Sequence, residues 1–524
     1  MTLATIVRKE FLGHVLTLRF VIGAVFTLVL FVAAGLVLRS DYADRVTAYR
    51  DAAGTHRQEL AGAKVFSAVV VEVDRPPSPL SVICQGVDRS LPTSSSFSIL
   101  DAPTVSGAGA TRNPLLVVLP TLDLTIVVQV VMSLLALVFA YDVVSGERIR
   151  GTLALTLANR VPRATLLLGK YLGGMAVLLP LLVVGFGAAL VVILTSPLVS
   201  LTARDWAAIG VTLVVSAAYL SVVFLLGMVI SVATRRPGTS LVAGLFAWVV
   251  LVLLAPPAAS AAAAAIRPLP SQRDRAVAEQ QAERTAWRGM NKYKSSHLCP
   301  VSYEDQSRFN RQRWSYYSGA IPFLTRLYSA PREYVQWALN GVRFGMPLQL
   351  KAAAEVQALR WRTLRAMASQ EDLARRLRLL SPAGVLYDAV AALSDTDAGR
   401  YLRFQTAVRA QREALLQLAR ANNGLDWRFF TRRAALRMPT LEQLHAMVAA
   451  GNQSRINAIL GRSFDDEPAI DMSGLPSFQL PEAPLADRLA RAGLDLAALG
   501  LVNLVLLLAA VVLFLRSDVR PGGA

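Results

Sequence analysis

Six apolar runs of about 20 residues constrain this chain more than any other feature of its sequence. A helix needs roughly 20 mostly apolar residues to cross a bilayer. The expected spans lie at or within residues 20–39, 115–140, 166–194, 206–232, 239–265 and 496–516. Hydrophobic residues make up 54% of the 524 residues and charged residues 17%, and the mean hydropathy is +0.44. This composition excludes a purely soluble domain and a disordered chain.

Basic residues indicate the orientation, because cytoplasmic loops of membrane proteins are enriched in Lys and Arg. They gather in four connections that alternate along the chain, so all four are expected on the cytoplasmic side. Both termini, including the tail at residues 517–524, are then cytoplasmic. The basic residues concerned are Arg8, Lys9, Arg19, Arg148, Arg150, Arg160, Arg163, Lys170, Arg235, Arg236, Arg516 and Arg520.

The two long connections, residues 40–114 and 266–495, are then extracytoplasmic. From Arg267 to Leu494 there are 33 Lys+Arg and 21 Asp+Glu, so this segment carries 12 of the chain's 18 excess positive charges. It is rich in Ala, Leu, Arg and Gln, and its apolar residues recur at helical spacing, which predicts a mostly helical domain with its own core. The shorter connection contains Val69-Val70-Val71, which favours a strand.

Residues 1–19, before the first span, form an amphipathic pattern. This pattern predicts a helix lying in the cytoplasmic membrane interface. The alternative is that the stretch extends the first span. The apolar stripe consists of Leu3, Ile6, Val7, Phe11, Val15 and Leu18, with Arg8 and Lys9 opposite.

The chain has two cysteines, Cys84 and Cys299, and both fall in the outer connections. The outside of the membrane is an oxidising compartment. We therefore predict a Cys84–Cys299 disulfide that joins the two outer segments. The alternative is two separate thiols.

Motifs for catalysis are absent from the sequence. It has no GxxxxGK[ST] loop for nucleotide phosphates, no HExxH zinc motif and no GxSxG nucleophile elbow. The four histidines, His14, His56, His297 and His445, are scattered and indicate no metal site. We therefore expect no enzymatic activity, metal or cofactor in this chain.

The connection between the second and third spans has the most distinctive pattern. It contains, in order, Glu147-Arg148, Gly151-Thr152-Leu153, Pro162-Arg163 and Gly169-Lys170. With this pattern the sequence resembles ABC-2 type permeases, the membrane subunits of ATP-binding cassette exporters. The resemblance is closest to a subgroup with a large extracytoplasmic insertion between spans five and six, related to the permease of nitrous-oxide-reductase maturation. Ser381-Pro382-Ala383 and Asp395-Thr396-Asp397 look like parts of that insertion.

The resemblance implies a bacterial cytoplasmic (inner) membrane protein that pairs with a second permease, either identical or paralogous. Each permease would bind a cytoplasmic ATPase subunit, which carries ATP and Mg. Residues 142–163 would be the coupling segment, seated in a groove of the ATPase. A charged tip at Glu147 suits such docking, so we expect Glu147→Lys to lower coupling without unfolding the protein. The residues expected at this contact are Glu147, Arg148, Arg150, Gly151, Thr152, Leu153 and Arg163.

Three polar residues in or beside the spans are candidates for a transport path. Ionisable or polar residues at such positions are often functional. Asp123 precedes the second span, and Gln129 and Asn503 lie inside spans. The alternatives are that Asp123 sits at the outer interface and that the other two make helix–helix contacts.

The expected fold is an all-α polytopic membrane protein with six transmembrane helices, an N-terminal interfacial helix and a large, mostly helical extracytoplasmic domain. The expected function is that of the permease subunit of an ATP-binding cassette exporter, which couples ATP hydrolysis to export or to mechanical rearrangement of the outer domain. The alternative is a membrane sensor or scaffold. The basic outer domain would meet membrane lipid or an acidic protein partner, and we expect no nucleic acid partner.

Overall fold

The computed structural model describes residues 3–106, 123–153, 156, 162–301, 332–431, 439–452, 454–455, 458 and 469–517. Within these residues, six helices are long and apolar enough to cross a membrane. This confirms the prediction of an all-α polytopic membrane protein. The six candidate spans are Leu18–Ala61, Leu124–Ile149, Arg163–Leu194, Ala203–Ala233, Pro237–Ile266 and Leu485–Arg516.

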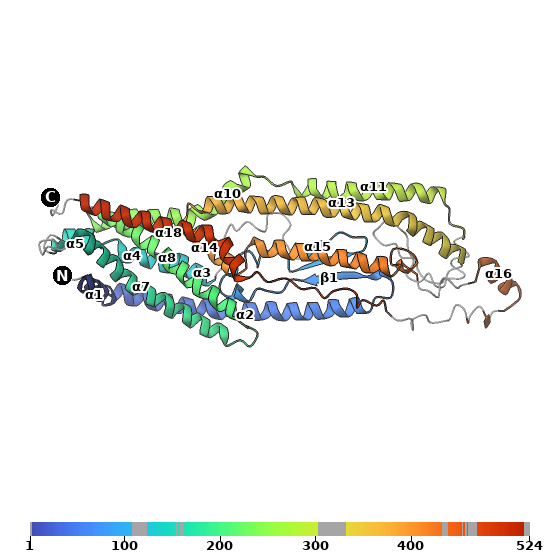
Figure 1. Cartoon of the computed structure of the whole chain (residues 1–524), viewed down its shortest axis with the longest axis horizontal. Helices are drawn as coiled ribbons and strands as arrows, with labels where there is room; N and C mark the ends of the chain where they lie inside the picture. Colours follow the sequence, from blue (N-terminus) through green and yellow to red (C-terminus); the bar gives the residue numbers. More distant parts are fainter. Residues whose placement is uncertain are drawn as a thin grey trace.

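The spans form a bundle at one end of an elongated molecule (Figure 1). We call the end of the bundle where α1, α5 and the end of α18 lie the terminal face. The elements of the bundle are α1 (Leu3–Val15), α2 (Leu18–Ala61), α3 (Leu124–Ile126), α4 (Ser133–Ala140), α5 (Ser145–Ile149), α7 (Arg163–Leu194), α8 (Ala203–Ala233), α9 (Pro237–Trp248), α10 (Ala255–Ile266) and α18 (Leu485–Arg516). Since α1 ends at Val15 and Thr17 caps the start of α2, α1 is a separate helix and not an extension of the first span.

Two of the spans contain a π-helical turn, at Val127–Met132 and at Val249–Leu254. The second turn precedes Pro256, whose ring would clash with the carbonyl group of Val252 in a regular α-helix. The wider turn accommodates this ring. The two turns lie next to each other, because Trp248 Nε1 donates a hydrogen bond of 2.8 Å to Ser133 Oγ. Turns of this kind are frequent at functional sites.

Glycines in α7 allow its neighbours to approach closely. A Cβ atom at Gly174 would lie 2.3 Å from the ring of Phe224 on α8, and one at Gly185 would lie 2.5 Å from the ring of Phe31 on α2. Phe31 is completely buried and packs against the ring of Phe186. The ring therefore has no space to move into.

Gly185→Ala is expected to lower the free energy of unfolding by about 1–3 kcal/mol, because overpacking a filled core has about this cost. The matched control is Gly187→Ala in the same helix. Nothing lies within 4 Å of a Cβ atom at Gly187, so there the better helix propensity of alanine is expected to stabilise the protein by up to about 1 kcal/mol. Thermal unfolding in detergent measures both variants. Shifts of the same sign and size would contradict the packing argument.

Most of the described chain between residues 62 and 106 and between residues 267 and 484 forms a second unit that we call the polar domain. Its helices are α11 (Gln272–Ser296), α13 (Arg332–Arg378), α14 (Pro382–Leu393), α15 (Ala398–Ala421) and α16 (Leu441–Ala449), with short 3-10 helices at Phe66–Ala68, Pro79–Val82 and Trp427–Phe429. A small antiparallel sheet has the order β1 (Val70–Asp74), β2 (Ser94–Ser98), β3 (Thr104–Ser106). β1 lies where the valine run predicted a strand, and Val71 pairs with Phe97.

The polar domain has its own apolar core, which includes Phe66, Phe97, Phe404 and Val408. The helix α14 connects this domain to the bundle. Residues 383–393 of α14 are all buried, and the helix packs against α8 and α18. Its N-cap residue, Ser381, donates a hydrogen bond to the carbonyl group of Leu251 in the fifth span. α14 therefore joins the two units.

Two spans continue into the polar domain without a break. α2 has 44 residues and runs from the bundle along the polar domain to Ala61 (Figure 1). α18 begins at Leu485, before the apolar run that starts near Leu496. These helices extend past the boundaries that hydropathy alone gives, so bundle and polar domain share rigid elements.

Candidate functional site

The predicted coupling segment lies at the terminal face, and its described part is residues 142–153, 156 and 162–163. The short helix α5 follows the second span after a turn at Tyr141–Val144. Its first turn is tied to the end of α8, because the backbone N–H groups of Val144 and Ser145 each donate to Ser231 Oγ at 3.1 Å. The start of the segment is therefore held rigidly against the fourth span.

Glu147 lies inside a cluster of four charged side chains. Its carboxylate is 2.9 Å from Lys170 Nζ on α7 and 3.6 Å from Lys9 Nζ on α1. Lys170 also donates to Glu10 Oε1 at 3.0 Å. Side-chain exposure is 9% for Glu147 and 2% for Lys170. The expectation of an exposed charged tip at Glu147 is therefore wrong, because an internal cation already neutralises this carboxylate.

Two arginines of the segment bind the carboxyl ends of other spans. Arg148 Nη1 donates to the carbonyl of Thr234 at 2.8 Å, at the end of α8. Arg163 Nη1 donates to the carbonyls of Phe514, Leu515 and Ser517, at 3.2, 2.9 and 3.2 Å, at the end of α18. Cations suit helix C-termini, where carbonyl groups lack helical partners. Both arginines therefore join the segment to the spans.

Other residues of the predicted contact remain accessible. Gly151 has a φ of +72°, a left-handed conformation that turns the chain after α5. Arg150 and Thr152, on either side of it, are exposed, and Ile149 is 59% exposed. Leu153 is buried. Among the described residues of the segment, the surface available to a partner includes a small patch of Ile149, Arg150 and Thr152, which we call the tip patch.

Among the described residues, no hydrogen bond joins the three candidate path residues to one another. Asp123 caps α3, where its carboxylate accepts from the N–H groups of Ile126 at 3.0 Å and Gln85 at 3.1 Å. Burial raises the pKa of Asp123 to about 6. Its place directly before the second span agrees with the interface alternative.

The other two path candidates contact neighbouring spans. Asn503 of α18 donates to the carbonyl of Ala218 at 3.0 Å and accepts from Ser221 Oγ at 2.6 Å, both on α8. The carbonyl of Gln129 accepts from the hydroxyl of Tyr219, also on α8, at 2.8 Å. The bonds of Asn503 agree with the helix–helix alternative, whereas the bond at Gln129 uses its backbone carbonyl and its side-chain Oε1 is buried without a hydrogen-bond partner among the described residues.

The predicted disulfide is not present. Cys84 is fully buried in the core of the bundle, whereas Cys299 is exposed beyond the end of α11. α11 has 25 residues, so it extends about 37 Å along the polar domain away from the bundle (Figure 1). The Cys299 thiol donates to the carbonyl of Val301 at 3.5 Å. The expectation failed because the predicted topology assigned both cysteines to outer segments but carried no information on the distance between them.

A cluster of buried charges lies where α14, α15 and α18 meet, and the sequence patterns did not predict it. Its centre is Asp395, which is fully buried with a φ of +52°. Arg400 Nη1 lies 3.3 Å from its carboxylate and Arg491 Nη2 2.9 Å, and Arg403 also contacts it. Burial alone would raise the pKa of Asp395, but Arg403 and Arg400 outweigh burial and hold that pKa below its usual value. We call these four residues the junction cluster.

Further buried ion pairs surround the junction cluster. Arg378 of α13 binds Asp388 of α14 with two hydrogen bonds of 2.8 and 2.9 Å and also contacts Glu371. Burial raises the pKa of Glu371 to about 7. Arg488 of α18 lies 3.4 Å from Asp205, at the start of α8, and both side chains are buried. The first pairs join α13 to α14, and the last joins the spans α18 and α8.

The six candidate spans define a polytopic membrane protein. The sequence profile of ABC-2 family transporter proteins matches residues 4–519, which is nearly the whole chain. The chain therefore belongs to the ABC-2 transporter family.

One similar protein is the probable ABC transporter permease protein NosY of Pseudomonas aeruginosa. It is 43% identical to this chain over 72 residues, which are 14% of this chain and 26% of NosY. The match thus spans about a quarter of the length of that relative. It agrees with the resemblance to the nitrous-oxide-reductase maturation permease.

Proposed function

We propose that this chain is the permease subunit of an ATP-binding cassette system in a bacterial cytoplasmic (inner) membrane, with the terminal face in the cytoplasm. Membership of the ABC-2 family supports the first part. The orientation is supported by the basic residues between α8 and α9, Arg235 and Arg236, which are exposed beside the coupling segment. The polar domain is then extracytoplasmic.

The tip patch is the proposed contact with a separate ATPase subunit. Its apolar member, Ile149, would enter a groove of the partner, and Arg150 would pair with a carboxylate there. The buried contacts of Glu147 and Arg148 support transmission, because they join the patch to α1, α7 and α8. A displacement of the patch by the ATPase would therefore move several spans together.

We propose mechanical rearrangement of the polar domain as the output, in preference to export through the bundle. The observation that carries this choice is the direct connection between spans and polar domain, through the unbroken helix α2 and the ion pair of Arg491 on α18 with the buried Asp395. The separate positions of Asp123, Gln129 and Asn503 offer no comparable support for a path through one chain.

A second copy or a paralogue is the proposed partner within the membrane. We compared how much of the most apolar 18-residue stretch of each span is buried inside the chain. The buried share is 22%, 17% and 17% in the first, fifth and sixth spans, against 67% in the second span. These accessible faces leave room for a second permease as well as for lipid. We propose that paired permeases each bind one ATPase.

Ile149→Asp and Arg150→Glu test the proposed contact. Each is expected to reduce permease-dependent ATPase activity at least tenfold in proteoliposomes that contain the permease and its ATPase, because each removes one side chain from the centre of a small interface. Thermal unfolding of the permease alone should change little, since both residues are exposed. Arg236→Glu is the control, with the same charge change on the same face. Unchanged ATPase activity in both variants would refute the contact.

Spin labels test the mechanical output. Cysteines at Gln58, near the end of α2 that runs along the polar domain, and at Glu283 of α11 would carry them in a Cys299→Ser background. We expect ATP binding to change the distance between the labels by several ångströms, and we expect Ile149→Asp to abolish that change. An unchanged distance together with ATP-dependent solute export would favour the exporter.

A further inference from the structure

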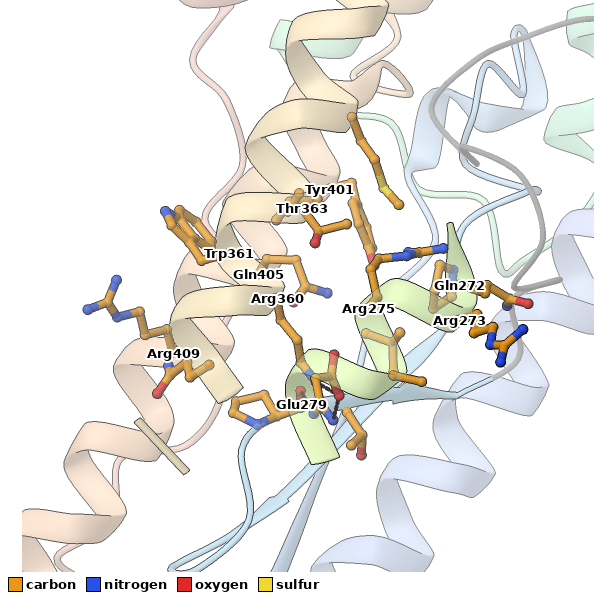
Figure 2. A pocket seen from close by; sticks show the side chains of 18 residues that line it. Gln272, Arg273, Arg275, Glu279, Arg360, Trp361, Thr363, Tyr401, Gln405 and Arg409 are labelled. Atoms are coloured by element: carbon orange, nitrogen blue, oxygen red, sulfur yellow. Dashed lines mark hydrogen bonds and ion pairs between the residues drawn. The ribbon is translucent and has the colours of Figure 1, made fainter. Parts of the chain in front are cut away.

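A cavity of about 740 Å³ opens between α11, α13, α15 and the sheet of the polar domain. Figure 2 shows the side chains that line it. Its size falls in the range of pockets for small organic ligands, roughly 300–1,000 Å³. The apolar part of the lining is formed by Trp361, Leu364 and Met367 of α13 and by Tyr401 of α15. The cavity therefore offers an aromatic and aliphatic wall to a ligand.

The charge around this wall is positive. Arg273 and Arg275 come from the first turn of α11, and Arg409 comes from α15. The amino end of a helix carries a partial positive charge, which favours anions. Three arginines and this helix end thus face one cavity.

The acidic residue in the lining is already neutralised. Glu279 binds Arg360 through its Oε2, at 2.8 Å from Nη2 and 3.2 Å from Nε. Arg360 also donates to the carbonyls of Ala102 and Pro103 at 3.2 and 2.8 Å. In the part of the chain that the structure describes, Arg273 and Arg409 form no ion pair with a carboxylate. Their charge is therefore available to a ligand.

A buried amide provides a second, independent indication of a ligand. The Nε2 atom of Gln405 is buried, and its one partner among the described residues, the hydroxyl of Tyr401, is placed short of good hydrogen-bond geometry. Gln405 lies in the cavity lining, between Arg360 and Tyr401 in Figure 2. Leaving a buried donor unsatisfied costs about 1–3 kcal/mol. An acceptor atom on a bound molecule would remove this cost.

We propose that this cavity binds a small organic anion with an aromatic or aliphatic body and a carboxylate or phosphate group. Arg409 pairs with the anionic group, Arg273 and Arg275 on the other side of the lining add to the positive charge, the body packs on Trp361 and Tyr401, and an oxygen of the ligand accepts from Gln405 (Figure 2). The apolar wall distinguishes this ligand from a bare inorganic anion. The site depends neither on the orientation of the chain nor on the ATPase contact.

Isothermal titration of the full-length chain in phosphatidylcholine nanodiscs tests this proposal. The probes are 1-naphthoate, 1-naphthyl phosphate and the neutral 1-naphthol, with empty nanodiscs as the reference. We expect at least one anion to bind at least tenfold more tightly than 1-naphthol, and the tighter anion identifies the group that the arginines prefer. Equal binding of all three probes, or no binding above the empty nanodiscs, would overturn the proposal.

Variants locate the binding. Arg409→Gln is expected to weaken the anion about tenfold, as the loss of one charge-assisted hydrogen bond predicts, and Trp361→Ala should weaken it by a similar factor. Arg376→Gln is the control, because Arg376 is an exposed arginine of α13 that does not line the cavity. An equal loss in Arg376→Gln and Arg409→Gln would show that general charge, and not this cavity, holds the anion.

Discussion

Asp395→Asn is expected to lower the free energy of unfolding by about 3–5 kcal/mol, the cost of removing one partner from a buried ion pair. Asp395 has no exposed surface, and its carboxylate meets the guanidinium groups of Arg400, Arg403 and Arg491. Asparagine has the same size and tolerates a φ of +52°. The substitution therefore tests the charge without changing the backbone.

Chemical unfolding in detergent measures this effect, and an exposed pair is the control. Asp426 binds Arg343 at 2.7 Å, but the two side chains are 35% and 57% exposed. Asp426→Asn should therefore cost less than about 1 kcal/mol. Similar losses in the two variants would mean that the junction cluster contributes no more than a surface pair.

Lys170→Met is the second substitution with a large expected effect, again about 3–5 kcal/mol. The methionine keeps the length of the side chain but leaves the carboxylates of Glu10 and Glu147 without their buried cation. We expect α5 to detach from α7 in this variant and ATPase coupling to fall together with stability. Glu147→Lys should act in the same way, so a loss of coupling in that variant would not by itself indicate direct docking.

A double-mutant cycle separates the interaction between Lys170 and Glu147 from the other contacts of these two residues. Lys170→Met combined with Glu147→Gln should cost less than the sum of the two single changes, because the second change removes the charge that the first leaves alone. Lys9→Met is the control, since Lys9 is 56% exposed and 3.6 Å from Glu147, and it should cost less than about 1 kcal/mol. Additive losses would refute a direct interaction between residues 147 and 170.

The sequence predicted the membrane bundle well, because crossing a bilayer requires long apolar runs that are visible in one dimension. The strand at β1 follows from local residue types in the same way. The family pattern at residues 147–170 also located the loop that the structure ties to the spans. In each case the decisive information lies within one short segment.

The sequence did not predict contacts between distant segments. From the sequence, Glu147 is expected to be an exposed loop residue. Only the folded structure shows that Lys170 of α7 lies beside it. The same is true of Asp395, whose partner Arg491 lies 96 positions away, and of Cys84, which the fold separates from Cys299. Charged residues are usually exposed, so only the packed helices reveal which of them are buried and paired.

The length of α2 has a consequence for how far small motions travel. Its 44 residues make a rod of about 66 Å. If the rod pivots near its middle, where it leaves the apolar part of the bundle, a tilt of about 10° moves its far end by about 6 Å. A change of little more than an ångström close to the pivot thus becomes, at Ala61, a displacement wider than a strand-to-strand spacing. A shift near the pivot that is too small to open a pore is therefore enough to move a surface far from the apolar part of the bundle.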